Sequence, residues 1–432
     1  MKSPNPTLHD DVHDSHSGIP LVVVAEEVDA DSPISDLVEE ALMSIRQHLD
    51  MDVAFVGAFR DGHRVFEYVS SRHLDSQVRV GGSNPLEDSY CQRVVDGRLP
   101  PLIRDATRLT EALKLPVTTA LPVGAHLSVP IRFRDGTLYG TLCCFSHQAD
   151  QSLSKRDLGM MTHLATFLGL QLERQTRAQR RQDRMRSRIS EVLGTGAFDP
   201  VFQPILNLPT GDLWGFEALT RFRADCNRSP DQWFADATGV GLGVALELAT
   251  ARKALAVARE FPNTTRVSLN VSPETILDAR LHGVLADWPV DRIVLEVTEH
   301  VSVGDYDRIA RSLAAFRARG LRLAVDDAGA GYASFRHILS LQPDIIKLDM
   351  SLVRGIDTDS GRRALAAALI GFAAETGARI VAEGVETHAE LATLRELGVC
   401  AAQGYLLGRP VPLVEALLIQ ESGVSRLRDA IH

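Results

Sequence analysis

The stretch Leu323–Gly331 reads Leu-Ala-Val-Asp-Asp-Ala-Gly-Ala-Gly, and it joins a strand-like apolar run to two adjacent carboxylates, Asp326 and Asp327. Side chains alternate between the two faces of a strand, but this rule relaxes at the strand end, so both acids can turn toward one point beyond the sheet. Carboxylates that lie so close repel each other unless a cation lies between them. A polar strand end followed by a turn would explain this stretch alone, but the same pattern recurs along the second half of the chain.

Strand-like and helical runs alternate on both sides of this stretch, from Phe198 onward. The strand candidates are Val201–Leu206, Trp214–Leu219, Arg266–Val271, Arg292–Val297, Leu321–Asp326, Ile345–Leu348, Arg379–Ala382 and Val399–Tyr405. The helical runs include Gly243–Glu260, Pro273–Ala286, Tyr306–Arg319, Gly361–Thr376 and His388–Leu397. Such alternation implies an α/β fold with a parallel sheet, and eight strand candidates fit a (β/α)8, TIM-like barrel.

Polar side chains stand at the C-terminal ends of seven of these strands. They are Glu217, Asn270, Glu296, Asp326 with Asp327, Lys347, Glu383 and Gln403. Strand ends of a barrel converge on one face, and oxygen donors in this number suit Mg²⁺ or Mn²⁺ better than zinc. Two such cations, roughly 3.5–4 Å apart, align the attacking and leaving oxygens in many phosphodiesterases and nucleases. A polar strand end explains any single member, but converging carboxylates without a cation would be unfavourable.

Lys347 is the one cation in this set, and it is flanked by Ile345, Ile346 and Leu348. A lysine at a strand end is ordinarily a solvated charge. Among apolar neighbours and facing a ring of carboxylates, it is better interpreted as an active-site lysine that offsets charge growing on phosphoryl oxygens. Arg221 can bind phosphate through its guanidinium group.

Seven motifs in this half occur in order and at a spacing that fits successive strand ends. They are GFEALTR (215–221), SLNVS (268–272), LEVTE (295–299), VDDAGAGYAS (325–334), IKLD (346–349), AEGVE (382–386) and QGYLLGRP (403–410). This series resembles that of the EAL-domain phosphodiesterases and covers nearly all of Phe198–Pro412. The resemblance implies hydrolysis of one ester bond of cyclic di-GMP, which gives linear pGpG.

The resemblance also implies a two-metal site. One metal would be bound by Glu217, Asn270, Glu296 and Asp326. Asp326 would bridge to a second metal, to which Asp327 contributes, with Glu383 at or near it.

The remaining roles implied by the resemblance concern the reaction and the substrate. Lys347 would contact the nucleophilic water and the reacting phosphate, Glu383 would be the general base, and Glu299 would steady the loop after Asp327. The residues expected to touch the dinucleotide are Gln203, Leu219, Arg221, Asp349, Gln403, Arg409 and Pro410.

The chain departs from the family pattern at a few positions. Alanines stand at 328 and 330, where the family carries phenylalanine and a small hydroxyl residue, and this loop couples the metal site to the family's dimer interface. Phe222 replaces a common tryptophan, and LGRP (407–410) replaces FSRP. None of these changes removes a ligand. A catalytically silent cyclic di-GMP receptor is the alternative, although such members usually lack metal ligands or the base. No GGDEF stretch is present, so synthesis is not predicted.

The first half has a mixed α and β pattern. Ser32 and Pro33 would begin a helix over Ile34–Leu49, and hairpins are expected around Asp61–Gly62 and Asp135–Gly136. A further helix begins at Lys155. The segments EDSYCQRVVDGRLPPLIRDA (87–106) and HLSVPIRFRDGTLYGTLCCFS (126–146) resemble a GAF sensory domain. Such modules bind varied small molecules or only dimerise, so the resemblance leaves the ligand, or a redox signal, open.

Cysteine usage leaves two interpretations for this domain. Cys91, or the Cys143–Cys144 pair, could be a redox or cofactor-attachment point. Buried, inert thiols are the more common state of free cysteine. The five cysteines show no metal-ligand spacing, which favours reduced thiols in a cytoplasmic protein.

Length and composition set the domain plan. The 432 residues exceed one ordinary core, and we predict a disordered tail (1–31), a GAF-like domain (32–174), a connecting helix (175–196) and an EAL domain (197–432). Histidines and aspartates in the tail could bind metal, but the tail has few apolar residues to order it. No apolar run approaches the roughly 20 residues of a membrane span, and we see no signal peptide.

The net charge of the chain and the distribution of its arginines limit the partners that it can bind. A formal charge of −10 argues against a general nucleic-acid-coating role, although arginines are dense in Gln171–Leu193. A nucleic-acid arm is one interpretation of that segment. We favour a solvated connecting helix, because Leu170, Met185, Ile189 and Leu193 form a thin apolar stripe that could pair with its copy in a homodimer.

Overall fold

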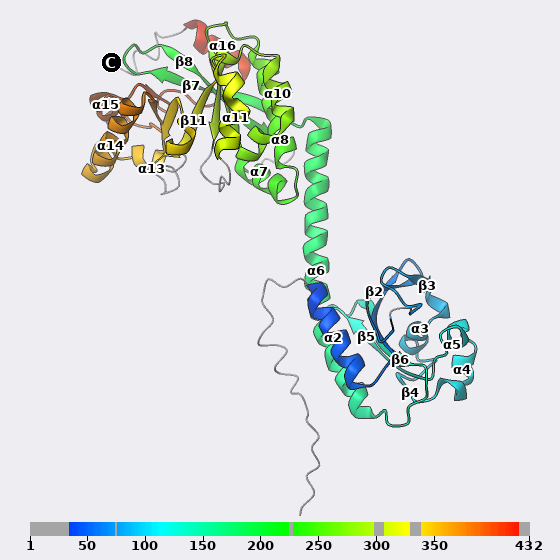
Figure 1. Cartoon of the computed structure of the whole chain (residues 1–432). Coiled ribbons are helices and arrows are strands. Elements are labelled where there is room, and N and C mark those ends of the chain that lie inside the picture. The colour runs from blue at the N-terminus through cyan, green and yellow to red at the C-terminus, as the bar shows by residue number, and fades with distance from the viewer. Residues whose placement is uncertain (1–33, 74–75, 224–227, 298–305, 329–337, 423–432) are drawn as a thin grey trace, which may run out of the picture. The chain divides into compact units, whose positions relative to one another are not determined.

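The computed structural model describes residues 34–73, 76–223, 228–297, 306–328 and 338–422. The chain divides into two compact units, Met1–Arg180 and Arg181–His432 (Figure 1). Helix α6 (Lys155–Thr195) begins in the first unit and ends in the second, so the last helix of the sensor domain and the expected connecting helix are one element. The predicted tail, 1–31, and the predicted helix start at Ser32 and Pro33 lie outside the described residues.

The first unit is built on a six-stranded antiparallel sheet with the order β3-β2-β1-β6-β5-β4. Its strands are β1 (Val53–Arg60), β2 (His63–Ser71), β3 (Ser83–Pro85), β4 (Leu102–Ile103), β5 (Ala125–Arg132) and β6 (Leu138–Ser146). Both predicted hairpins are confirmed. Asp61 and Gly62, between β1 and β2, have φ values of 47° and 75°, and Gly136, between β5 and β6, has φ 84°. Gly62 and Gly136 adopt these left-handed values without steric conflict, and aspartate is among the few other residues that tolerate this region.

Each face of this sheet has its own apolar core, because successive side chains on a strand point to opposite faces. Helices α2 (Ile34–His48) and α6 cover one face (Figure 1). Helices α3 (Tyr90–Val95), α4 (Thr110–Leu113) and α5 (Pro116–Ala120) cover the other. The remaining short helices of the unit are η1 (Leu86–Asp88) and η2 (Ala106–Arg108).

The second unit is a closed eight-stranded barrel with the order β10-β11-β12-β13-β14-β7-β8-β9. Its strands are β7 (Phe198–Asn207), β8 (Leu213–Phe222), β9 (Arg266–Val271), β10 (Ile293–Val297), β11 (Arg322–Ala328), β12 (Ile345–Leu348), β13 (Arg379–Ala382) and β14 (Ala401–Ala402). The expected barrel is therefore present with its eight predicted strands, although the last, expected over Val399–Tyr405, spans only Ala401–Ala402.

One feature of the barrel corrects the expectation of a parallel sheet. Strand β7 runs antiparallel to both of its neighbours, β8 and β14. The chain turns back between Asn207 and Leu213, with Gly211 at φ 71°, so no helix separates β7 from β8. Two strands joined by a short turn must be antiparallel, because a parallel pair needs a long crossover.

Helices cover the outside of the barrel (Figure 1). They are α7 (Pro230–Gly239), α8 (Gly243–Ala258), α9 (Pro273–Leu277), α10 (Ala279–Ala286), η3 (Val290–Arg292), α11 (Tyr306–Arg317), α13 (Met350–Val353), α14 (Ser360–Thr376), α15 (His388–Glu396) and α16 (Leu413–Ser422). The single helix expected over Pro273–Ala286 is two helices. Asp278 separates them, and its carboxylate accepts a hydrogen bond from the backbone N–H of Arg280 and caps α10.

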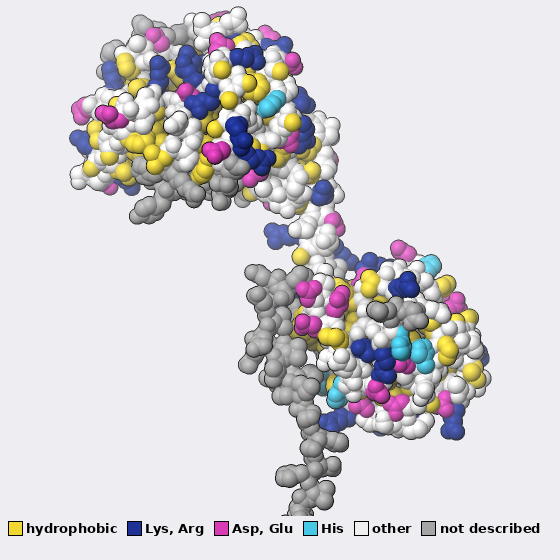
Figure 2. Space-filling model, in the orientation of Figure 1, with side chains coloured by type: hydrophobic (Ala, Val, Ile, Leu, Met, Phe, Trp, Pro, Cys, Tyr) yellow, Lys and Arg dark blue, Asp and Glu magenta, His cyan; other side chains and the backbone are white. Residues whose placement is uncertain are grey.

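The end of α6 belongs to the core of the second unit. Ile189 and Val192 are buried with Phe198, Trp233 and Leu246. Part of the apolar stripe expected to pair in a homodimer therefore packs within the second unit. On the face seen in Figure 2, basic and acidic side chains are interspersed over the barrel unit. No helix of the described residues is both long enough and apolar enough to span a membrane.

Replacing Phe202 by alanine should destabilise the barrel unit by about 3–5 kcal/mol. Phe202 is buried, and its ring lies 5.0 Å from that of Phe261 and 6.3 Å from that of Phe216, so truncation leaves a cavity. Denaturant unfolding followed by tryptophan fluorescence reports on this unit, because Trp214, Trp233 and Trp288 all lie in it. Val414→Ala, at an exposed position, is the control; a loss below about 1 kcal/mol for Phe202→Ala would contradict the packing.

Acidification should destabilise the first unit through His126. Burial, aided by the positive charge of Arg64, lowers the pKa of His126 to about 3. The unfolded chain binds a proton near pH 6.5 and the folded unit does not, so stability falls by about 1.4 kcal/mol per pH unit from pH 6.5 toward 3. Far-ultraviolet circular dichroism on full-length protein measures this, with tryptophan fluorescence reporting the barrel separately. In His126→Phe the free energy of unfolding should depend less on pH, by the contribution of His126. An unchanged pH dependence would refute the assignment to His126.

Candidate active site

The barrel interior has an apolar layer with a polar layer directly above it. Ile205, Trp214, Val294, Ala324, Ile345, Val381 and Ala401 form the apolar layer. Two residues further along five of these strands stand Glu296, Asp326, Lys347, Glu383 and Gln403. A step of two residues keeps a side chain on the same face, so the strands that bury the apolar layer also direct these polar groups inward.

Lys347 is at the centre of the polar layer, and it is only 1% exposed. Its Nζ lies 2.6 Å from Glu296 Oε2, 2.5 Å from Glu383 Oε1 and 3.2 Å from Asp326 Oδ2. Glu217 Oε2 is farther, at 3.9 Å. Four carboxylates from four different segments therefore surround one ammonium group.

Three side-chain amides extend this network toward β7. Asn270 donates to Glu217 Oε1 at 2.7 Å, and Gln403 donates to Glu217 Oε2 at 2.5 Å. Gln403 Nε2 also donates to Gln203 Oε1 at 3.0 Å, and Gln203 donates to the carbonyl of Gly408 at 3.1 Å. The antiparallel β7 contributes Gln203 because its register places that residue opposite Glu217.

The backbone continues the sheet beyond two strand ends that carry site residues. The N–H of Glu383 donates to the carbonyl of Leu348 at 3.1 Å, and that of Gln403 donates to the carbonyl of Ala382 at 2.8 Å. Glu383 and Gln403 follow β13 and β14 directly, so these hydrogen bonds hold both residues in register with the barrel.

Burial and crowding shift the protonation equilibria of the network. Burial lowers the pKa of Lys347, but the surrounding carboxylates outweigh it, so this pKa lies well above its ordinary range. Burial raises the pKa of Glu296 to about 8 and that of Glu383 well above its ordinary range; neighbouring carboxylates add to both shifts, and Lys347 opposes them. Burial also raises the pKa of Glu217, but Lys347 and the hydrogen bonds from Gln403 and Asn270 lower it overall.

The donor set fits a hard divalent cation in its chemistry. The carboxylates outnumber the one buried cation four to one, and oxygen donors of this kind suit Mg²⁺ or Mn²⁺. The Oε1 atom of Gln403 is buried and accepts no hydrogen bond from the described residues. As the described side chains lie, no three histidine, cysteine, aspartate or glutamate residues converge as metal ligands, and the Lys347 ammonium takes the central position. Glu217, Asn270, Glu296, Asp326 and Glu383 are the residues that would bind such an ion.

The other predicted site residues lie outside this hydrogen-bonded network. Leu219 and Arg221 follow Glu217 on the same face of β8, and Arg221 is exposed. Asp349 caps α13, where its carboxylate accepts a hydrogen bond from the N–H of Ser351 at 2.9 Å. Arg409 is exposed and Pro410 half-buried in the segment after β14. Glu299 and the side chain of Asp327 lie outside what the structure describes.

Tyr405 was not singled out from the sequence. Its ring is 52% exposed, and the guanidinium carbon of Arg409 lies 4.3 Å from the ring centroid. The signal available in the sequence was an aromatic residue two positions after Gln403. Such a ring offers a flat surface on which a base can stack.

A closed barrel with an acidic, lysine-centred interior defines a candidate metal-dependent hydrolase. The EAL domain family matches residues 186–410, and the GAF domain family matches residues 33–172. The chain belongs to the EAL-domain family and carries a GAF domain on its N-terminal side.

Several known proteins are similar to this chain. A cyclic di-GMP phosphodiesterase of Pseudomonas aeruginosa is 33% identical over 249 residues, which is 54% of this chain and 42% of that protein. The manganese and cyclic di-GMP complex of BlrP1 from Klebsiella pneumoniae is 30% identical, covering 50% of this chain and 56% of that one, with a TM-score of 0.46. The EAL enzyme Bd1971, solved with cAMP and cyclic di-GMP, covers 86% of this chain and 93% of that one at 18% identity and a TM-score of 0.52. This chain spans 30% to 44% of the length of three curated relatives.

Mn²⁺ should stabilise the barrel unit through these carboxylates. An ion that binds only the folded state adds about 2.7 kcal/mol to the free energy of unfolding when its free concentration is one hundred times its Kd. Unfolding of the full chain, followed by tryptophan fluorescence with and without Mn²⁺, measures the gain. Glu217→Gln and Asp326→Asn should reduce it, whereas Glu415→Gln, at an exposed position on α16, should keep it. An equal gain in all variants would show that the ion binds elsewhere.

Proposed function

We propose that the chain hydrolyses cyclic di-GMP to linear pGpG in a reaction that depends on Mg²⁺ or Mn²⁺ at a two-metal site. The observation that carries the proposal is the network of four carboxylates around Lys347 inside an EAL barrel. Every first-metal ligand that the family resemblance implies is among the described residues and belongs to this network. The similar Pseudomonas protein is named a phosphodiesterase for the same dinucleotide, which supports the choice of substrate.

The proposed reaction divides its work between the cation site and the side chains. Divalent cations bound here would make water more acidic and neutralise phosphate charge. Glu383 accepts a proton from the attacking water, whose oxygen forms a bond to phosphorus. The bond from phosphorus to the leaving ribose oxygen breaks, and that oxygen takes up a proton from solvent. Lys347 has the fixed charge and the burial needed to stabilise negative charge on the phosphoryl oxygens. Asp327 would contribute to the second metal, and Glu299 would steady the loop after it, as the family resemblance implies.

Substrate contacts would lie at the rim of the barrel. Arg221 and Arg409 are exposed arginines that can bind phosphate, and Leu219 offers an apolar contact on the same face of β8 as Glu217. Asp349 and Pro410 would also contact the substrate at the rim. The buried amides of Gln203 and Gln403 complete the set of proposed substrate contacts.

Regulation is the remaining part of the proposal. The GAF domain would tune the rate through α6, which belongs to both compact units. A homodimer would form the working assembly. Ala328 is buried at the end of β11, in the position where the family carries phenylalanine, so its side chain can contribute less to any coupling through that loop.

The test is a hydrolysis assay on the full chain with Mn²⁺ or Mg²⁺ and cyclic di-GMP, with the product resolved by chromatography. Wild type and Glu415→Gln should form pGpG. Glu217→Ala and Lys347→Ala should be slower by at least about 100-fold, because each removes a group that stabilises the transition state electrostatically. Circular dichroism verifies that the variants fold. No turnover by the folded wild type with either metal would refute the proposal.

The same experiment distinguishes the enzyme from a second candidate, a receptor that binds cyclic di-GMP without hydrolysing it. The alanine at 328, where the family carries phenylalanine in the loop that couples the metal site to the dimer interface, is the feature that favours this alternative. A receptor would bind the dinucleotide in titration calorimetry and leave it intact with either metal. Binding followed by cleavage excludes it.

A further inference from the structure

The GAF unit contains a buried cation with no carboxylate partner among the described residues. Arg64, on β2, is 4% exposed. Its guanidinium carbon lies 4.4 Å from the ring centroid of Phe66 and 5.3 Å from that of Phe55. Its Nε donates to Asn84 Oδ1 at 3.0 Å, and its Nη1 donates to Cys91 Sγ at 3.3 Å. Since an uncompensated buried charge is unfavourable, the sulfur of Cys91 is the group best placed to carry the balancing negative charge.

A second thiol lies next to Cys91. The Sγ atoms of Cys91, on α3, and Cys143, on β6, are 3.2 Å apart, and both side chains are buried. Two hydroxyls surround the second sulfur, because Ser128 Oγ lies 3.0 Å from Cys143 Sγ and Thr141 Oγ1 lies 3.2 Å from it. A disulfide bond is about 2 Å long, so the two sulfurs need to approach by only about 1 Å.

The two thiols have unequal acidity. Burial raises the pKa of Cys91, but the hydrogen bond with Cys143 and the positive charge of Arg64 outweigh it and lower this pKa to about 5. Burial and the neighbouring Cys91 raise the pKa of Cys143. A thiolate beside a thiol is the arrangement of a reactive cysteine with its resolving partner.

Cys144 shows that adjacency in sequence does not create this arrangement. It follows Cys143 on β6, so its side chain points to the other face of the sheet, into the core beneath α2 and α6. Burial raises the pKa of Cys144 to about 12. The sequence suggested Cys91 alone or the Cys143–Cys144 pair, whereas the structure brings Cys91 next to Cys143.

We propose that Cys91 and Cys143 form a redox-active pair in the GAF domain, which a hydroperoxide oxidises to an intramolecular disulfide. The Cys91 thiolate attacks the terminal peroxide oxygen, the O–O bond breaks, and protonation releases water or an alcohol, which leaves a sulfenic acid on Cys91. The thiol of Cys143 then attacks that sulfur, the S–O bond breaks, and the hydroxyl leaves with the Cys143 proton as water. Together, one peroxide is reduced by two electrons and the two thiols are oxidised to one disulfide.

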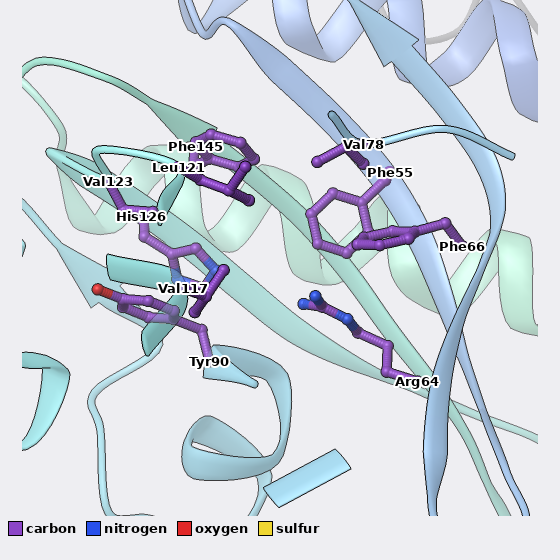
Figure 3. A pocket seen from close by; sticks show the side chains of 10 residues that line it. All are labelled: Phe55, Arg64, Phe66, Val78, Tyr90, Val117, Leu121, Val123, His126 and Phe145. Atoms are coloured by element: carbon purple, nitrogen blue, oxygen red, sulfur yellow. The ribbon is translucent and has the colours of Figure 1, made fainter. Parts of the chain in front are cut away.

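Arg64 also lines a small cavity. It measures about 20 Å³, and the guanidinium of Arg64 points into it from the side opposite Tyr90 and His126 (Figure 3). A cavity of this size accommodates one water molecule, so it suits hydrogen peroxide better than a bulky organic peroxide. Arg64 both lines the cavity and contacts Cys91 Sγ, so this residue connects the cavity with the reacting sulfur. Tyr90 precedes Cys91 on α3, and closing the disulfide would move the helix that lines one side of the cavity.

The test treats the reduced full chain with hydrogen peroxide, blocks the remaining thiols by alkylation, and maps tryptic peptides by mass spectrometry. Wild type should give a disulfide between peptides 80–93 and 135–155, which contain Cys91 and Cys143 respectively. Peptide 135–155 also contains Cys144, so Cys144→Ala is the matched control and should give the same cross-link. A wild type that stays reduced while the exposed Cys400 is oxidised would overturn the proposal, as would a cross-link that requires Cys144.

Two variants test the chemical roles separately. Cys143→Ser should stop at the sulfenic acid, which a cyclic 1,3-diketone traps at Cys91, and Cys91→Ser should give neither product. Arg64→Gln should slow disulfide formation by about tenfold, because it reduces the thiolate fraction of Cys91. Circular dichroism verifies the fold of each variant, and the wild-type experiment stands without them. An unchanged rate in folded Arg64→Gln would refute the activation of Cys91 by that residue.

Discussion

The ammonium group of Lys347, buried among Glu217, Glu296, Asp326 and Glu383, is the interaction on which the barrel's interior depends. A buried charge is tolerated only where opposite charges and hydrogen bonds compensate it. Here each partner comes from a different strand or strand end, so the network forms only when the barrel closes. Its position above an apolar layer keeps it in a region of low dielectric, where its electrostatic interactions are strong.

The same rule, applied to the GAF unit, leads to different chemistry. Arg64 is also a buried cation, but its neighbours are two aromatic rings, an amide oxygen and the sulfur of Cys91. With no carboxylate partner among the described residues, the guanidinium favours the ionised form of a thiol. One unit thus concentrates negative charge suited to divalent cations, and the other stabilises a nucleophilic sulfur.

Much of the candidate site followed from local patterns. The positions of Glu217, Asn270, Glu296, Asp326, Lys347, Glu383 and Gln403 were recognisable, because each polar residue lies within or directly after an apolar strand-like run. Gln203 was assigned only through the family resemblance. Its buried hydrogen bonds to Gln403 and to the Gly408 carbonyl depend on the antiparallel course of β7, which strand-like periodicity does not specify. Periodicity measures which residues face a core, not the direction in which a strand enters the sheet.

The sequence by itself determined the two-domain plan, the eight barrel strands, the oxygen-rich donor set and the family, because these depend on short-range patterns and motif spacing. The tertiary structure decided which side chains meet. It placed Lys347 against four carboxylates, used Ile189 of α6 in the core of the barrel unit, and paired Cys91 with Cys143 across 52 positions instead of Cys143 with its neighbour. The physical reason is that adjacent residues on a strand diverge to opposite faces, whereas distant segments packed on one face bring their side chains into contact.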